Sequence, residues 1–174
     1  MPDTDTDRED FFALYQVMKK AERGEPVTAA FLGGSVTQGS KASLPENCYA
    51  ALTCKWLRER FPRAEIRYVN AGMGATGSLI GAHRLEPDVL AHRPDLVFVE
   101  FAVNDRNAPD DREAYESVVS RLLGEAEPPA VLALFMGKED GYCVQEQQKT
   151  ICRRYGLPTL SIRDAVQNLS LIHI

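Results

Sequence analysis

Apolar positions along the chain fall into two patterns, which predict strands and helices respectively. Short apolar runs bounded by turn residues are typical of buried strands. Longer stretches with apolar residues three and four positions apart are typical of helices that pack on a core. The predicted strands are residues 27–32, 66–69, 96–101, 131–135 and 159–162. The predicted helices are residues 11–23, 49–61, 78–92, 111–123 and 144–155.

The order of these elements predicts an α/β fold. Strands that alternate with helices form parallel sheets, and right-handed crossovers place helices on both faces. We therefore expect a three-layer α/β/α sandwich around a mainly parallel five-stranded sheet. No internal repeat or linker is visible, so residues 1–168 are expected to form a single domain. Ligands of such sheets bind beyond the carboxyl ends of the strands.

Composition and charge narrow the function classes. The net charge is −5, and the 20 Lys and Arg residues are scattered instead of forming a basic stripe, so a nucleic-acid partner is not expected. The four cysteines match neither a zinc site nor a redox pair, and we expect no metal and no cofactor. No apolar run approaches the roughly 20 residues that span a bilayer. Without a signal core at the start either, we expect a cytoplasmic protein with no membrane insertion.

The first predicted strand runs into a glycine turn that ends in Ser35. A serine at such a turn can attack an acyl carbonyl when a base removes its proton, whereas a capped loop is the plain structural alternative. The same stretch nearly matches a phosphate loop from Gly34 to Gly39. However, Lys41 follows Ser40 where that motif requires lysine before the hydroxyl, which disfavours a nucleoside triphosphatase.

Two further loops follow the second and third strands. Gly72, Gly74 and Gly77 satisfy the spacing G-x-G-x-x-G, with Glu100 about twenty residues further on, as a dinucleotide site requires. This leaves a dinucleotide-binding oxidoreductase as an alternative function. After the third strand comes Asn104, followed directly by an aspartate. A carboxamide there can donate to an oxyanion, although Asn-Asp pairs also form turns and helix caps.

Together, these three loops resemble the first three conserved blocks of the SGNH (GDSL-like) hydrolases, which have a flavodoxin-like fold. The blocks lie at residues 33–35, 70–74 and 103–105, and the resemblance covers residues 27–164. Gly34 stands where the eponymous Gly-Asp-Ser-Leu motif has aspartate, a variant familiar in the family.

The resemblance implies a role for each site residue. Ser35 is the expected nucleophile, and the expected oxyanion donors are its own backbone N–H, the backbone N–H of Gly74 and the Asn104 side chain. Because the second block varies in length, Gly72 or Ala75 is the alternative source of the second amide.

The expected function is therefore serine ester hydrolysis without a cofactor. The expected substrate is a small-molecule or carbohydrate ester, with a short-chain or O-acetyl group transferred to serine and then to water. A non-catalytic ligand- or carbohydrate-binding module on the same fold is the alternative.

The end of the sequence departs from the family pattern. The family carries an Asp-x-x-His block that supplies the base, and no segment matches it. Three residues before His173 stands Ser170 instead of aspartate, and His83 and His92 fall in a predicted helix. Residues 169–174 resemble the translation of a sequencing adapter. We therefore expect a non-native tail at 169–174 and a domain that lacks its last segment and its catalytic base.

Overall fold

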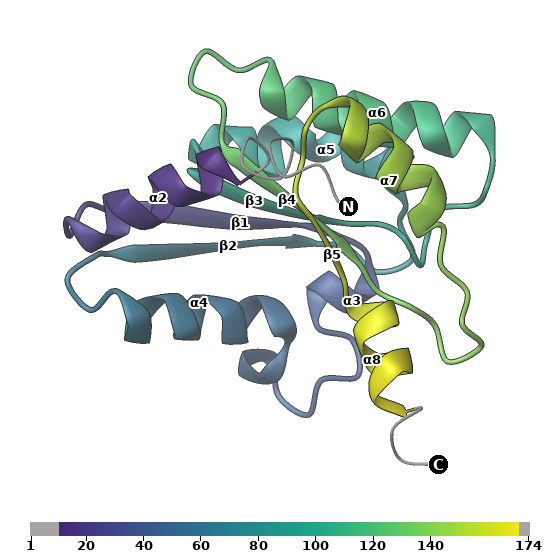
Figure 1. Ribbon diagram of the computed structural model, residues 1–174, viewed down its shortest axis with the longest axis horizontal. Helices are drawn as coiled ribbons and strands as arrows, with labels where there is room; N and C mark the ends of the chain where they lie inside the picture. Colours follow the sequence, from purple (N-terminus) through teal and green to yellow (C-terminus); the bar gives the residue numbers. More distant parts are fainter. Residues whose placement is uncertain (1–10, 171–174) are drawn as a thin grey trace, which may run out of the picture.

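The computed structural model of the chain describes residues 11–170 and shows one five-stranded sheet between helices (Figure 1). All neighbouring strands are parallel, and their spatial order is β2-β1-β3-β4-β5. The predicted mainly parallel sheet is therefore confirmed. In chain order the strands are β1 (Val27–Gly33), β2 (Ile66–Gly72), β3 (Leu96–Glu100), β4 (Ala130–Phe135) and β5 (Thr159–Ser161).

Helices cover both faces of the sheet, as the three-layer prediction requires. Figure 1 shows α5, α6 and α7 on one side of the strands and α4 on the other. Buried residues of α2 and α4 share one apolar cluster, and those of α5, α6 and α7 share a second. The long helices are α2 (Phe12–Glu22), α4 (Tyr49–Arg60), α5 (Ser78–Asp88), α6 (Pro109–Leu123) and α7 (Gln145–Arg154).

Successive side chains of the central strands point alternately into the two apolar clusters. Leu32 and Val99 point into the cluster beneath α5 and α6, whereas Phe31 and Phe98 point into the cluster beneath α2 and α4. The rings of Phe31 and Phe98 stack with centroids 4.5 Å apart. Each fully buried side chain of this size contributes about 1.5–3 kcal/mol, so the sheet's middle is a rigid support for the loops at its ends.

Four short elements were not predicted as separate helices. They are α3 (Ser35–Gln38), η1 (Pro45–Asn47), η2 (Leu90–His92) and α8 (Ile162–Ser170). The predicted helix 78–92 is wrong at its end, because α5 stops at Asp88. Pro87 has no N–H to donate to the carbonyl four residues earlier, which weakens the last turn of α5. Val89 then leaves helical geometry, with φ of −129° and ψ of −63°, before η2 begins.

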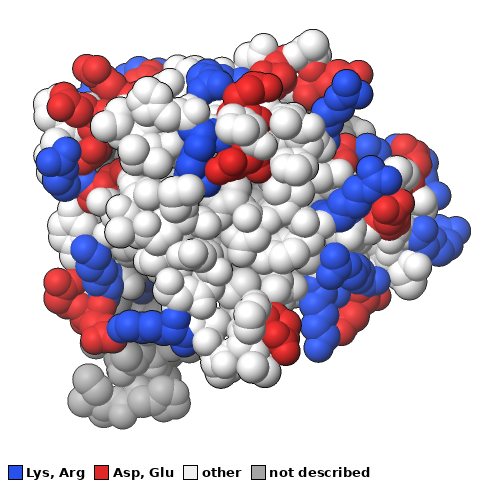
Figure 2. Space-filling model, turned by 180° about the vertical axis from the view of Figure 1, so that it is seen from behind, with Lys and Arg blue, Asp and Glu red and all other residues white. Residues whose placement is uncertain are grey.

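The surface carries mixed charge. On the face seen from behind, acidic and basic side chains alternate around a middle that carries neither (Figure 2). Within residues 11–170, no helix is long and apolar enough to cross a membrane. Leu169 and Ser170 of the predicted tail end α8, whereas residues 1–10 and 171–174, including His173, lie outside the described residues.

Candidate active site

The register of the sheet brings the three predicted loops to one edge. Gly33 at the end of β1 pairs with Gly72 at the end of β2 and with Glu100 at the end of β3. The loops that leave these strands therefore start side by side. β1 and β3 are neighbours in the sheet but not in the chain, so the strand order reverses between them. This is the switch point at which open α/β sheets bind their ligands.

Ser35 opens the short helix α3 directly after β1. It is half-buried, and its hydroxyl makes no hydrogen bond to any residue within 11–170. Its carbonyl oxygen accepts the N–H groups of Gly39 and Ser40 at 3.1 and 2.9 Å, which closes the turn tightly. Gly39 has φ of 97°, a left-handed value that glycine adopts without strain. The turn thus leaves the Ser35 hydroxyl free for chemistry.

Asn104 packs against the backbone just before Ser35. A Cβ atom on Gly34 would lie only 2.2 Å from Asn104 Oδ1, so glycine is needed for this close approach. The Asn104 N–H donates to Phe101 O at 2.9 Å, which holds the turn after β3. A carboxamide in this position can donate an N–H to an oxygen atom bound above Ser35.

The loop after β2 supplies backbone amides beside Ser35. The Gly72 N–H donates to Asn70 Oδ1 at 2.9 Å, and the Met73 N–H donates to Gly33 O at 3.0 Å. Both amides are therefore occupied, which excludes Gly72 as a free donor. Within the described chain, the amides of Gly74 and Ala75 make no hydrogen bond.

Gly74 lies in contact range of the Ser35 side chain. A Cβ atom on Gly74 would lie 4.0 Å from Ser35 Cβ and 2.8 Å from Gln38 Oε1. Ala75 has φ of 60°, an uncommon backbone state for a residue with a side chain. The loop therefore holds a bent conformation next to the serine, which sequence spacing alone does not reveal.

Asn70 ties this loop to α3. Its Nδ2 donates to Thr37 O and to the Tyr68 hydroxyl, each at 2.9 Å. The Thr37 hydroxyl is in turn 2.9 Å from the hydroxyl of the half-buried Tyr49. The asparagine at the start of the second loop therefore holds the serine helix against β2.

Asp105 is a buried anchor. Its carboxylate accepts the backbone N–H of Ser78 at 2.7 Å and Gln148 Nε2 at 2.9 Å, together with a short hydrogen bond from the Ser78 hydroxyl. Burial raises the pKa of this carboxyl, and the Ser78 hydrogen bonds act in the opposite direction. Asp105 thereby fixes the starts of α5 and α7 beside the site.

Glu100 does not fit the role that the dinucleotide spacing gave it. Its side chain is fully buried, and burial together with the nearby Asp105 raises its pKa to about 7. A carboxylate that binds a ribose hydroxyl must reach the ligand at the surface. The G-x-G-x-x-G match is therefore a tight turn. A dinucleotide-binding oxidoreductase would lack the acidic residue that binds the ribose.

The two histidines of the described chain lie on helices and have no hydrogen bond to Ser35. His83 is exposed and lines a shallow pocket between α5 and α6. His92 is exposed and precedes β3, at the amino edge of the sheet. The expectation that neither is a base for the serine stays a prediction.

Arg84, which is 8% exposed on α5, is a site residue that the sequence pattern does not predict. Its guanidinium donates to Gly33 O and to Ala71 O, the carbonyls at the ends of β1 and β2. Its position in the helix could have indicated burial, because Arg84 falls on the buried face of α5 with Gly81 and Leu85.

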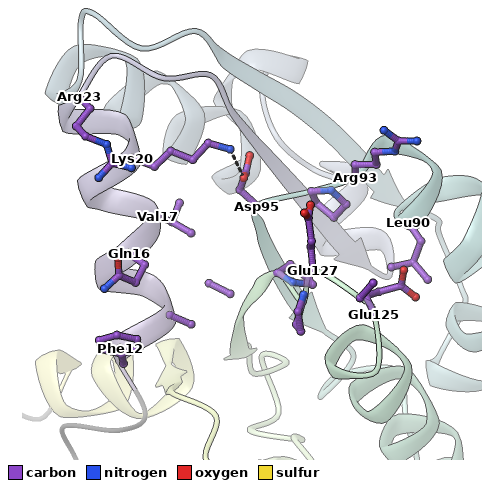
Figure 3. A pocket seen from close by; sticks show the side chains of 16 residues that line it. Phe12, Gln16, Val17, Lys20, Arg23, Leu90, Arg93, Asp95, Glu125 and Glu127 are labelled. Atoms are coloured by element: carbon purple, nitrogen blue, oxygen red, sulfur yellow. Dashed lines mark hydrogen bonds and ion pairs between the residues drawn. The ribbon is translucent and has the colours of Figure 1, made fainter.

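A pocket of about 760 Å³ lies at the opposite edge of the sheet, between α2 and the turns before β3 and β4. Figure 3 shows Lys20 bonded to Asp95 within it, with Arg93, Glu125 and Glu127 nearby. No serine or cysteine lines this pocket. The loops that carry Ser35, Gly74 and Asn104 leave the opposite, carboxyl edge of the sheet. Within residues 11–170, no cluster of acidic, cysteine or histidine residues fits a metal ion.

A parallel α/β/α sandwich with these three loops at its switch point has the architecture of an esterase or acylhydrolase domain. The chain belongs to the GDSL-like lipase/acylhydrolase family, whose model matches residues 31–171. Among curated proteins, no sequence matches this chain.

Solved structures agree with this membership. A two-domain esterase active on acetylated mannans is 40% identical, with a TM-score of 0.85 over 88% of this chain, and it has also been crystallised with mannopentaose. The chain spans 42% of that esterase, less than half its length. A lipase/acylhydrolase from Enterococcus faecalis is 21% identical with a TM-score of 0.63, covering 81% of this chain and 78% of its own. That second likeness shows the fold alone.

Proposed function

We propose that this chain carries the nucleophile and oxyanion hole of a serine ester hydrolase. The observation that carries the proposal is the meeting of three loops at the switch point. The Gly74 loop lies beside the Ser35 side chain, and the Asn104 carboxamide lies against Gly34. On this proposal Ser35 is the nucleophile, and its own amide, the Gly74 amide and the Asn104 side chain hold the oxyanion.

The proposed reaction has two steps. Ser35 Oγ bonds to the ester carbonyl carbon while a base takes its proton, and the carbonyl electrons move onto the oxygen held by the three donors. The bond to the alcohol then breaks, and the alcohol leaves with the proton. Water cleaves the acyl-serine in the same way and releases the carboxylic acid. The base is expected from an Asp-x-x-His segment of the kind that the family resemblance implies.

The proposed substrate is an acetyl ester on a carbohydrate. The similar two-domain esterase is active on acetylated mannans, and the identity of 40% over most of this chain supports a related substrate. A neighbour of the same fold at 18% identity is an acetylxylan esterase from Geobacillus stearothermophilus, which adds support for the fold only. The net charge of −5 also favours a neutral sugar ester over an anionic bilayer lipid.

Acetate release from acetylated mannooligosaccharides tests the proposal, with imidazole added as an external base. Ser35→Ala should lower the rate by about two orders of magnitude or more, because the nucleophile is lost. Ser40→Ala, an exposed serine five residues further on, is the matched control and should keep the rate. Equal rates for Ser35→Ala and the unmodified chain would refute the mechanism. Saturable sugar binding with no Ser35-dependent hydrolysis would instead indicate the binding module.

A further inference from the structure

Arg84 joins the two strand ends from which the site loops leave. Its Nη2 donates to Gly33 O at 2.9 Å, and its Nη1 donates to Ala71 O at 2.5 Å. Gly33 is the last residue of β1, and Ala71 is the last but one of β2. A single planar guanidinium on α5 therefore bridges neighbouring strands at the carboxyl edge of the sheet.

The two carbonyls lie close in sequence to the proposed catalytic groups. Gly33 is two residues before Ser35, and Ala71 is three residues before Gly74. Gly33 O also accepts the Met73 N–H at 3.0 Å, so the same oxygen links both loops. Any change in the Arg84 fork therefore acts on the serine turn and on the Gly74 turn together.

Stability alone does not explain a guanidinium at this position. Arg84 is 8% exposed, its Nε is buried without a partner in the described chain, and its one carboxylate, Asp88, pairs with Nη1 at 3.0 Å. Burying a cation has a large desolvation cost, and apolar replacements of buried ion pairs are often neutral or stabilising. The arrangement is therefore explained better by the geometry it imposes.

We propose that Arg84 is a positioning residue that sets the distance between the Ser35 hydroxyl and the free amides of the Gly74 turn. The inference rests on the proposed function for its effect on rate, although the geometry itself can be tested without activity. Only arginine holds two oxygens in a fixed fork, whereas lysine offers a single ammonium group. Displacing catalytic groups by about 1 Å can lower a rate by about a hundredfold.

Arg84→Lys tests the proposal, and Arg58→Lys is the matched control. Arg58 also donates to β2, but to Ile66 O at the amino end of the strand, with Nη2 at 3.0 Å. In Arg84→Lys we expect the backbone amide resonances of Gly74 and Ala75 to move and kcat for acetate release to fall by about tenfold or more, with KM within about twofold. In Arg58→Lys we expect these resonances and kcat to stay as in the unmodified chain.

The two readouts separate the proposals. If Ser35→Ala leaves acetate release unchanged, the proposed function fails, and the amide resonances alone then decide the role of Arg84. If Arg84→Lys only lowers the melting temperature and moves neither readout more than Arg58→Lys, the positioning role is wrong. If Arg84→Lys does not fold, Asp88→Asn is decisive. This variant weakens the ion pair between Asp88 and Arg84 Nη1 and should move the amide resonances of Gly74 and Ala75. Unchanged resonances would overturn the proposal.

Discussion

At the scale of single residues, the site depends on side chains that are absent as much as on those present. Gly34 leaves the space that Asn104 fills, since a Cβ atom there would come within 2.2 Å of Asn104 Oδ1. Gly74 differs, because the nearest atom to its Cβ position is the flexible end of Gln38, at 2.8 Å. The two glycines are therefore expected to respond differently to substitution.

Gly34→Ala should displace the Asn104 carboxamide and lower the free energy of unfolding by about 1–3 kcal/mol, the usual cost of overpacking. Acetate release should fall as well, because the proposed oxyanion donor moves. Urea unfolding and initial rates are the measurements.

Gly124→Ala is the control for this substitution, at the end of α6, where the nearest atom to the new Cβ is Ser120 O at 3.1 Å. It should leave the rate unchanged. A Gly34→Ala variant with normal rate and stability would show that Asn104 does not need this space.

The sequence predicted where Ser35 and Asn104 lie, but not all of their surroundings. Ser35 and Asn104 follow apolar strands, so their position at the sheet edge came from strand order alone. The free amide could not be predicted, because it depends on which N–H groups Asn70 and Gly33 occupy. The sequence spacing also suggested Glu100 as the acidic residue of a dinucleotide site. Spacing gives only the distance along the chain and does not show that this side chain is buried in the core.

At the scale of helices and strands, Asp105 links three elements. It accepts hydrogen bonds from Ser78 at the start of α5 and from Gln148 in α7, while its own backbone follows β3. The core strands and most helices were predictable from apolar runs. This buried polar link was not, because an Asn-Asp pair after a strand is as typical of a simple turn.

Asp105→Ala should leave three buried donors unpaired and lower the free energy of unfolding by about 3 kcal/mol or more. Asp110→Ala, in the exposed first turn of α6, is the matched control. Asp110→Ala should lower the free energy of unfolding by no more than about 1 kcal/mol, the usual interaction energy of an exposed carboxylate with a helix end. Equal losses in urea unfolding would contradict the anchoring role.

At the scale of the whole molecule, stability should depend on pH through Glu100. Its pKa is raised from 4.5 to about 7 by burial, so the folded state binds its proton more tightly than the unfolded chain does. The unfolding free energy therefore falls as pH rises from about 4.5 to 7 and then levels off. Glu100→Gln should remove the part of this decrease in unfolding free energy that comes from Glu100.

We expect Glu100→Gln to be stabilised relative to the unmodified chain by about 2–3 kcal/mol more at pH 8 than at pH 5, an upper estimate from the pKa difference. Urea unfolding at the two pH values measures this difference. Glu125→Gln, on the exposed loop after α6, is the control and should show no such change. Parallel behaviour of the two variants would mean that Glu100 does not titrate in this range.

The proposed role of Ser35 is tested most directly by labelling the nucleophile with a fluorophosphonate, in imidazole buffer, and mapping the label by peptide mass spectrometry. The reagent forms a bond between phosphorus and an activated serine Oγ and releases fluoride. If Ser35 is the nucleophile, each chain carries one label, located on Ser35 and absent from Ser35→Ala. A label on another serine, or labelling no faster than in the unfolded chain, would contradict it.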